Sequence, residues 1–479
     1  MKRLIMKNTA LALGVLAIAF TGCKKGIDDF GTINNNPNAT TIPITAALLT
    51  NVQANIGGMA WGNGLNVNGG LYCQYMSETQ YTDASRYAAP TLNWDGFYAG
   101  DLYDLQNIIN TNSSEATKTV AATYGSNANQ IATARILKAY YYMQLTDAYG
   151  DIPYKEALQG KGTIAYDKQE VIYPDLLNEL KAAVAQFDNG AVFQGDVMFS
   201  GNVTKWKKFA NSLRAVIALR MSKANPTLGK AEFAAAIAAG VIESNADNAG
   251  ISYPGGNYRN PIYNYYVITQ RFDFAVSKTV TDYLTSIGDP RVNKFGNTTQ
   301  GFPYGLSRNE ALAWQTINPN FAFLYAFTAT PQTQPMFLLT AGQVYLARAE
   351  AAKQGWTTES VNAMYEAGVT AEMNRWGITD ATAIANYLAQ ASVALDGTND
   401  LRRIAEQRWV AHFPDGTQGW AEWRRTGFPV LTPAPGTGKQ VPRRIPYGPN
   451  EPLYNPTNYQ AAAALYNNNS QDAKVWWDK

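Results

Sequence analysis

Five residues between positions 257 and 271 combine aromatic rings with groups that donate and accept hydrogen bonds. They are Tyr263, Asn264, Tyr265, Tyr266 and Arg271. A sugar ring has one apolar face of C–H groups and a rim of hydroxyls. An aromatic side chain covers that face, while amide and guanidinium groups bind the rim. The segment therefore predicts a site at which an oligosaccharide stacks on tyrosine.

A second segment, residues 313–327, has the same character. Trp314 precedes Phe321, Phe323 and Tyr325 within it. The alternation of the last three residues is equally typical of a short strand with one buried face. A single aromatic residue is more often part of a core than of a binding surface, and only the clustering favours ligand contact. We expect Trp314 to contact ligand together with the tyrosines.

The stretch 61–98 is a third candidate for ligand binding, because it contains Trp61 and Trp94. Packing of Trp94 over a buried helix would explain that residue equally well. The sequence leaves these two interpretations open.

Catalysis has little support in the sequence. His412 is the only histidine, and a Ser/His/Asp triad would have to use it, but no Gly-x-Ser-x-Gly motif lies between a strand and a helix. A histidine near a helix C-terminus is favourable there without any catalytic role. A glycosidase needs two carboxylates roughly 5–9 Å apart, and no such pair stands out. We therefore predict a protein that is not an enzyme and needs no metal or cofactor.

Trp420 and Trp423 lie three residues apart, which places both on one face of a helix. Three arginines lie on the preceding predicted helix, namely Arg402, Arg403 and Arg408. One interpretation is a carbohydrate platform with arginine clamps. The other is a packed helix pair held by cation–π contacts and by ion pairs with Glu406 and Glu422. We favour the structural interpretation.

The composition excludes several classes of protein. The 479 residues include 39 Lys and Arg against 37 Asp and Glu, and the formal charge is +2. A hydrophobic content of 46% at so small a net charge excludes intrinsic disorder. The lack of a basic excess argues against nucleic-acid binding, and one His with two Cys is too few for a zinc site. A large, nearly neutral globular protein with 29 Tyr remains.

Residues 1–22 have the pattern of a lipoprotein signal peptide. Basic residues precede an apolar stretch over residues 10–20, which is too short for a membrane span, and Thr-Gly-Cys follows. We expect lipidation of Cys23 and a flexible tether over residues 23–40. An ordinary signal peptide followed by an incidental cysteine is the alternative. The second thiol, Cys73, is expected to be buried.

Helical periodicity over residues 41–479 predicts a mostly α chain, and its length allows one large domain or two or three smaller ones. The clearest helix covers 128–149, which is apolar on two faces and is followed by Gly150. Residues 336–353 and 358–374 predict a helix pair of tetratricopeptide-like type, although no fixed repeat period is present. Further helices are predicted over 167–187, 204–223, 230–240, 272–287, 399–412 and 417–426. The long loops 245–270, 289–334 and 427–458 are rich in aromatic residues and are expected to be ordered.

Several segments resemble, in the same order, those of the SusD/RagB family of outer-membrane nutrient-binding lipoproteins, and specifically its SusD-like branch. The tether contains NNNPN, and a helix runs into a Tyr-Gly-Asp-Ile-Pro-Tyr turn. Gly342 departs from the family pattern, in which Glu is usual. The matching segments are 34–38, 139–158, 201–222, 338–356, 404–431, 441–451 and 455–459.

The resemblance implies a single, mostly α-helical domain with tetratricopeptide-like helix pairs. In the family, such a lipoprotein caps a SusC-like TonB-dependent transporter barrel and captures oligosaccharides or peptides without covalent chemistry. The expected location is the outer membrane, with a lipid anchor and exposure at the cell surface. The expected ligand is an oligosaccharide that is delivered to the transporter. A peptide ligand, or less favourably glycoside hydrolysis, is the alternative, and no nucleic-acid partner is expected.

Overall fold

The structure is a computed structural model, and it describes residues 42–325 and 331–479. Helices make up most of these residues. Residues 45–479 form one unit by their contacts, and its strands are few and short. The predicted mostly α fold class is therefore confirmed. The expected signal peptide 1–22, Cys23 and the tether 23–40 lie outside the described residues.

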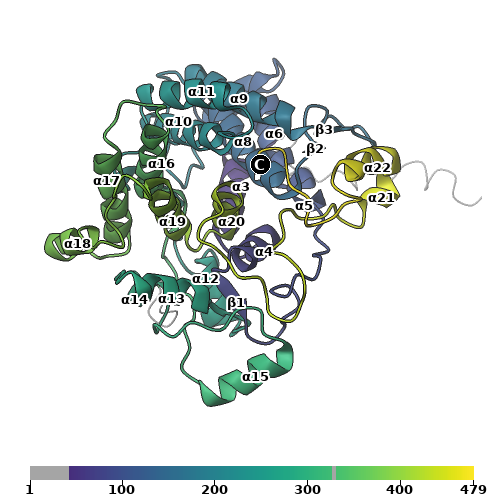
Figure 1. Cartoon of the computed structure of the whole chain (residues 1–479). Helices are drawn as coiled ribbons and strands as arrows, with labels where there is room; N and C mark the ends of the chain where they lie inside the picture. The colour runs from purple at the N-terminus through teal and green to yellow at the C-terminus, as the bar shows by residue number, and fades with distance from the viewer. Residues whose placement is uncertain (1–41, 326–330) are drawn as a thin grey trace, which may run out of the picture. The chain divides into compact units, whose positions relative to one another are not determined.

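The helices of the first half include one long helix that packs against several of the others (Figure 1). They are α3 (Thr45–Ala60), α4 (Gly64–Tyr72), α5 (Asp95–Ala99), α6 (Asp101–Ser113), α7 (Lys118–Ala121), the 3₁₀ turn η1 (Ala122–Tyr124), α8 (Asn127–Tyr149), α9 (Gln169–Gln186), α10 (Val203–Arg220) and α11 (Pro226–Ala238).

The second half contains both short and long helices. They are the 3₁₀ turn η2 (Asn245–Asp247), α12 (Pro261–Tyr263), the π-helical turn η3 (Asn264–Ile268), α13 (Lys278–Ser286), α14 (Val292–Phe295), α15 (Arg308–Ile317), α16 (Ala341–Lys353), α17 (Val361–Arg375), α18 (Ala381–Leu388), α19 (Asp400–His412), α20 (Gly416–Thr426), α21 (Glu451–Tyr454) and α22 (Pro456–Leu465).

Helix α8 was predicted correctly from the sequence, and its two ends and its burial explain why. The Ser126 side chain accepts a hydrogen bond from the Asn129 amide and caps the first turn. Nearly every side chain from Asn129 to Tyr149 is buried, as an apolar surface on two faces requires. At the C-terminus Gly150 adopts a φ of +86°, and a Cβ there would lie 2.4 Å from the Tyr466 hydroxyl oxygen. Only glycine fits this position.

Helix pairs form the layers of the fold. In Figure 1 α9, α10 and α11 lie together near α8, while α16 and α17 lie side by side at another edge. The contacts link α8 with α6 and α9, α10 with α11, and α16 with both α17 and α19. The predicted pairing of 336–353 with 358–374 is thus confirmed as α16 and α17. Short elements lie within the described parts of the predicted aromatic loops, and residues 326–330 of the loop 289–334 lie outside the described residues.

Three two-stranded antiparallel sheets join the helices in the described ranges: β1 (Met76–Glu78) with β5 (Phe274–Val276), β2 (Ile152–Pro153) with β3 (Tyr166–Asp167), and β4 (Ala249–Ile251) with β6 (Met336–Leu339). Two predicted helices were wrong at their starts. Residues 274–276 and 336–339 are strands, because distant partners in β1 and β4 supply backbone hydrogen bonds that local periodicity cannot reveal.

Helices α16 and α17 approach closely at two glycines. A Cβ on Gly342 would lie 2.4 Å from Glu372 Cγ and 2.8 Å from the Gly368 carbonyl oxygen. The Glu372 carboxylate is buried beside Gly342, where it accepts hydrogen bonds from the Thr340 hydroxyl and from Arg375. The departure from Glu at position 342 is therefore matched by a carboxylate that comes from the facing helix.

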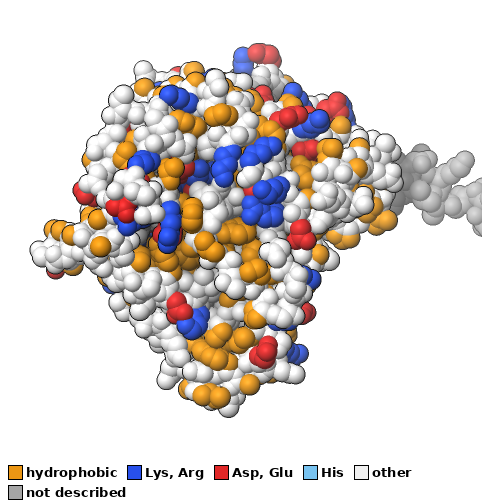
Figure 2. All heavy atoms as spheres, in the orientation of Figure 1, with side chains coloured by type: hydrophobic (Ala, Val, Ile, Leu, Met, Phe, Trp, Pro, Cys, Tyr) orange, Lys and Arg blue, Asp and Glu red, His pale blue; other side chains and the backbone are white. Residues whose placement is uncertain are grey.

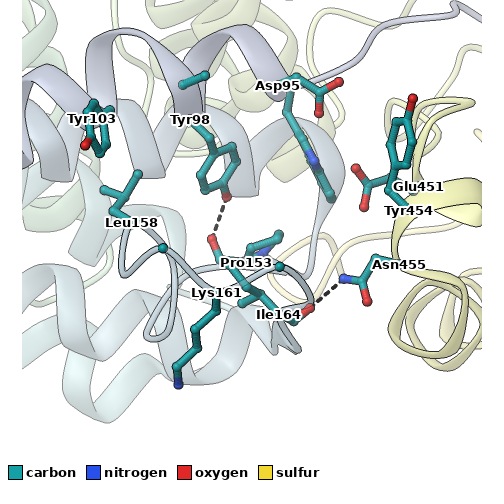
Figure 3. Close-up of a pocket in the computed structure, with 14 residues that line it drawn as sticks. Asp95, Tyr98, Tyr103, Pro153, Leu158, Lys161, Ile164, Glu451, Tyr454 and Asn455 are labelled. Atoms are coloured by element: carbon teal, nitrogen blue, oxygen red, sulfur yellow. Dashed lines mark hydrogen bonds between the residues drawn. The ribbon is translucent and has the colours of Figure 1, made fainter. Parts of the chain in front are cut away.

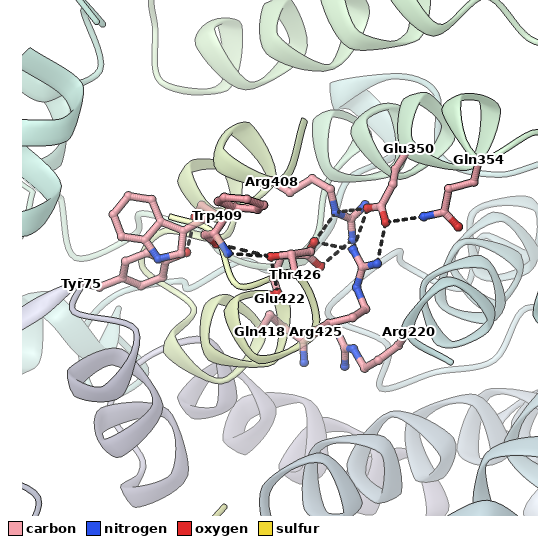
Figure 4. Close-up of polar contacts among 11 residues, drawn as sticks. Tyr75, Arg220, Glu350, Gln354, Arg408, Trp409, Gln418, Glu422, Arg425 and Thr426 are labelled. Atoms are coloured by element: carbon pink, nitrogen blue, oxygen red, sulfur yellow. Dashed lines mark hydrogen bonds and ion pairs between the residues drawn. The ribbon is translucent and has the colours of Figure 1, made fainter. Parts of the chain in front are cut away.

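A buried cluster of charges holds α16, α19 and α20 together (Figure 4). Arg408 Nε lies 2.8 Å from Glu422 Oε1, and Arg425 pairs with both Glu422 and Glu350 at 2.5 Å. Burial alone would raise the pKa of Glu422, but Arg408 and Arg425 outweigh it and hold that pKa below its usual value. The cluster is structural, because all four side chains are buried.

Candidate functional site

A cleft of about 370 Å³ lies where three distant segments of the chain meet beside the β1–β5 sheet. It brings together the ends of the two predicted aromatic segments and part of the 61–98 stretch. It is lined by Thr79, Gln80, Tyr81, Gln270, Arg271, Phe272, Asp273, Gln315, Phe321 and Phe323. We call this cleft the candidate site.

Hydrogen bonds to backbone carbonyls fix the three segments to one another. Beyond the end of the β1–β5 ladder, the Thr79 amide donates to the Asp273 carbonyl at 2.8 Å. The Thr79 hydroxyl donates to the Phe272 carbonyl at 2.7 Å, and Gln315 Nε2 of α15 donates to the Thr79 carbonyl at 2.7 Å. The cleft is therefore held by ordered backbone on each side.

Two aromatic side chains are exposed at the candidate site. The Tyr81 side chain is 55% exposed, and within the described chain its ring makes no aromatic contact and its hydroxyl no hydrogen bond. Phe272 is 39% exposed and packs edge-on against Phe323 with ring centroids 5.3 Å apart. Tyr81 thus presents a free ring, and Phe272 presents a partly exposed ring that packs against Phe323.

Asp273 organises the polar side of the cleft. Its Oδ2 accepts hydrogen bonds from the Tyr265 hydroxyl at 2.9 Å and from Arg271 Nε at 2.7 Å. The bond to Asp273 raises the pKa of Arg271, and burial together with Asp273 raises the pKa of Tyr265. Both donors therefore stay protonated at neutral pH. Arg271 is exposed and retains N–H groups that can reach a ligand.

The structure separates the five residues predicted between 257 and 271. Arg271 lines the cleft, and Tyr265 supports it through Asp273. Tyr266 is only 1% exposed and its hydroxyl donates to the Phe274 carbonyl, so its ring belongs to the core and has no free face. Tyr263 and Asn264 are not lining residues, and their contact with a ligand stays a prediction.

Trp314 lies on α15 and not in a loop. A capping box of Ser307 and Glu310 starts this helix. The indole is partly buried and packs against Phe302 and Phe321, with ring centroids 4.8 and 5.8 Å away. Trp314 therefore positions the Phe321 wall of the cleft. The same helix exposes Leu312 and Ile317, and Figure 2 shows hydrophobic side chains at the surface in this part of the molecule.

The tryptophans of the third candidate stretch are buried away from the candidate site. Trp61 packs against Tyr265, with ring centroids 5.3 Å apart, and Trp94 contacts four tyrosines. The sequence analysis did not single out the two exposed rings of the candidate site. Tyr81 lies within the range 61–98 but was not named, and Phe272 lies one residue beyond the segment 257–271. No local pattern distinguishes these two from other aromatic residues, because their exposure depends on distant segments.

The other residues that the sequence analysis considered for chemistry, namely His412, Trp420 and Cys73, are buried and structural. Burial, with Arg408 close by, lowers the pKa of His412 to about 3, so the imidazole is neutral. The preferred interpretation of the 420–425 segment holds, because Trp420 is buried and the Arg424 guanidinium lies 3.6 Å from the centre of its ring. Cys73 is buried as predicted. None of the helices in the described ranges has the length and apolar content that crossing a membrane requires.

The chain was compared with known proteins. A family model of SusD-like proteins, described as "Starch-binding associating with outer membrane", matches residues 36–448. None of the curated proteins compared with the chain matches it. A solved structure of a chitin-binding protein has a TM-score of 0.77 at 27% identity, over 91% of this chain and 100% of that chain.

Two further structures have the same fold. A Bacteroidetes protein titled "AC2a SusD-like" has a TM-score of 0.75 at 25% identity, over 91% of this chain and 99% of that chain. A SusD homologue from Bacteroides fragilis has a TM-score of 0.78 at 21% identity, over 91% of this chain and 100% of that chain. At that identity the last likeness shows the fold alone.

Proposed function

Because this chain belongs to the SusD-like family, described as starch-binding and associating with the outer membrane, we propose that it captures oligosaccharides in the candidate site. The observation that carries the proposal is the pair of exposed rings, Tyr81 and Phe272, beside the fixed polar groups of Arg271 and Asp273. The similar chitin-binding protein supports the same class of ligand.

The arrangement explains how a sugar would be held. The Tyr81 and Phe272 rings cover apolar sugar faces, Arg271 donates to hydroxyl oxygens, and Asp273 Oδ1 accepts from hydroxyls. Gln80 and Gln270 supply amides that both donate and accept, whereas Gln315 offers only its oxygen, because its N–H groups bond to the Thr79 and Ala311 carbonyls. Stacking contributes about 1 kcal/mol per ring beyond area burial, so the affinity is expected to be modest.

Binding without catalysis is the proposal that fits the residues lining the cleft. Asp273 is the only carboxylate among the lining residues that the structure describes, and it is already bonded to Tyr265 and Arg271. Glycoside hydrolysis ordinarily uses two carboxylates on opposite sides of the bond. We expect no release of reducing sugar from any glycan that binds.

The ligand prediction is tested by calorimetry with maltohexaose and chitohexaose. Tyr81→Ala and Phe272→Ala are each expected to weaken binding about fivefold, because each removes one stacking ring. Tyr258→Ala is the matched control, since this tyrosine is at least as exposed but does not line the cleft. Variants that fold normally and bind as tightly as the wild type would contradict the site. Binding of peptides but of no glycan would favour the peptide alternative.

We further propose that the protein delivers its ligand to a SusC-like TonB-dependent transporter barrel. The family description of outer-membrane association supports this pairing. A tagged protein extracted from membranes in mild detergent is expected to co-purify with a barrel. Recovery of the tagged protein with no barrel, while an unrelated membrane complex stays intact in the same extract, would count against the pairing.

A further inference from the structure

A second cleft of about 460 Å³ lies between α5 with the start of α6, the 153–164 loop and α21 (Figure 3). It shares no lining residue with the candidate site. The Tyr98 hydroxyl donates to the Pro153 carbonyl at 2.5 Å, and Asn455 Nδ2 donates to the Ile164 carbonyl at 2.6 Å. These bonds fix the 153–164 loop to both of the other walls. The volume is within the range of roughly 300–1,000 Å³ that small-molecule sites occupy.

Two tyrosines at this cleft have no role in holding the fold. Tyr103 is 49% exposed and Tyr454 is 71% exposed. Neither ring makes an aromatic contact and neither hydroxyl makes a hydrogen bond within the part of the chain that the structure describes. Tyr81 at the candidate site has the same combination of exposure and freedom. Trp94, in contrast, is buried among four tyrosines and forms a rigid wall.

Two carboxylates outnumber the one lysine among the charged groups of the second cleft. Asp95 and Glu451 line it, and neither carboxylate has an ion pair among the described residues. Asp95 accepts a hydrogen bond from Asn450 Nδ2 at 2.7 Å, and Glu451 accepts one from the Tyr166 hydroxyl. The ammonium group of Lys161 is held by Glu156 at 2.9 Å. The cleft therefore favours ligands that donate hydrogen bonds and disfavours ligands that carry negative charge.

The rings are spread along the cleft. Figure 3 shows Tyr103 with Leu158 at one end, Tyr98 between, and Tyr454 with Glu451 at the other end. Exposed rings at both ends of one cleft suit a chain of sugars, in which different residues can stack on different rings. We propose that this cleft is a second carbohydrate-binding site, which takes a neutral oligosaccharide through Tyr103 and Tyr454.

The test isolates the second cleft by removing the exposed rings of the candidate site. In a Tyr81→Ala/Phe272→Ala background, calorimetry with maltohexaose and chitohexaose is expected to find residual binding to at least one of them. Adding Tyr103→Ala and Tyr454→Ala is expected to weaken this residual binding at least fivefold. Leu453 lies on α21 beside Tyr454 and is as exposed as that tyrosine, but it does not line the cleft. Leu453→Ala is therefore expected to leave the residual binding unchanged.

The outcomes also distinguish this proposal from the proposed function. Residual binding that survives loss of Tyr103 and Tyr454 overturns the second site, as does the absence of residual binding in the background protein. If removal of Tyr81 and Phe272 changes nothing while removal of Tyr103 and Tyr454 abolishes binding, the second site stands and the candidate site fails. Binding of oligogalacturonate in the cleft as tight as that of the neutral hexasaccharides would overturn the charge argument.

Discussion

Asp415 is a buried carboxyl at the N-terminus of α20. It accepts hydrogen bonds from the Gln418 amide at 3.1 Å and from Asn66 Nδ2 at 3.3 Å. Burial nevertheless raises its pKa to about 8, so the folded protein keeps a proton there that the unfolded chain releases near pH 4. Between these values the folded state binds the extra proton, and the free energy of unfolding must fall as the pH rises.

The variant Asp415→Asn removes this titration and keeps the helix cap. Its free energy of unfolding, relative to the wild type, is expected to increase between pH 4 and pH 8 by on the order of 5 kcal/mol. Urea denaturation over that pH range measures the difference. Asp380→Asn, which makes the same replacement at the exposed N-cap of α18, is the control for the loss of a capping carboxyl. Parallel profiles for Asp415→Asn and the wild type would refute the argument.

At the scale of elements, the close approach of α16 to α17 restricts the residue at position 342. The nearest atoms to a Cβ at position 342 belong to the buried Glu372 side chain and to the backbone of Gly368, and neither can move freely. Gly342→Ala is therefore expected to lower the free energy of unfolding by about 2 kcal/mol, as overpacking does in other cores.

The control for this prediction is Gly96→Ala in α5. A Cβ there would meet no atom within 4 Å, and alanine favours a helix over glycine by up to about 1 kcal/mol. This variant is expected to be as stable as the wild type or slightly more stable. Equal thermal and chemical stability for Gly342→Ala and Gly96→Ala would show that the helix pair accommodates the extra methyl group.

At the scale of the whole molecule, the prediction concerns its attachment. Loss of residues 1–22 would remove Lys2, Arg3 and Lys7 and no acid, which changes the formal charge from +2 to −1. A protein so nearly neutral gains little electrostatic attraction to a membrane. We therefore expect lipid on Cys23 to supply the attachment, because buried acyl chains contribute about 0.8 kcal/mol per CH₂.

The variant Cys23→Ala tests the anchor. In cell fractionation, Cys23→Ala is expected to appear in the soluble fraction instead of the outer-membrane fraction. Cys73→Ala, which removes the buried thiol, is expected to partition as the wild type does. If Cys23→Ala remains entirely with the membrane, the lipid is not the anchor. Protease treatment of intact cells then reports whether the wild-type protein is exposed at the surface.

The sequence by itself determined most of the helices and predicted the class of ligand. The hydrophobic spacing within α8 is local, and it is enough to predict a helix buried on most sides. Tyrosine beside Asn and Arg likewise indicated sugar binding without any coordinates. The strands β5 and β6 escaped prediction, because their hydrogen-bond partners lie far away in the chain.

Only the tertiary structure decided which rings are free to bind. Tyr265 and Tyr266 are neighbours in the sequence, yet one supports Asp273 and the other is buried in the core. Tyr81 looked no different from other tyrosines, and it is exposed at the cleft that residues 270–273 and 315–323 complete. Exposure of a side chain is the sum of its contacts with the entire fold. A local sequence pattern therefore indicates what kind of ligand an aromatic side chain could bind. The packing of distant segments decides whether that side chain is exposed to a ligand.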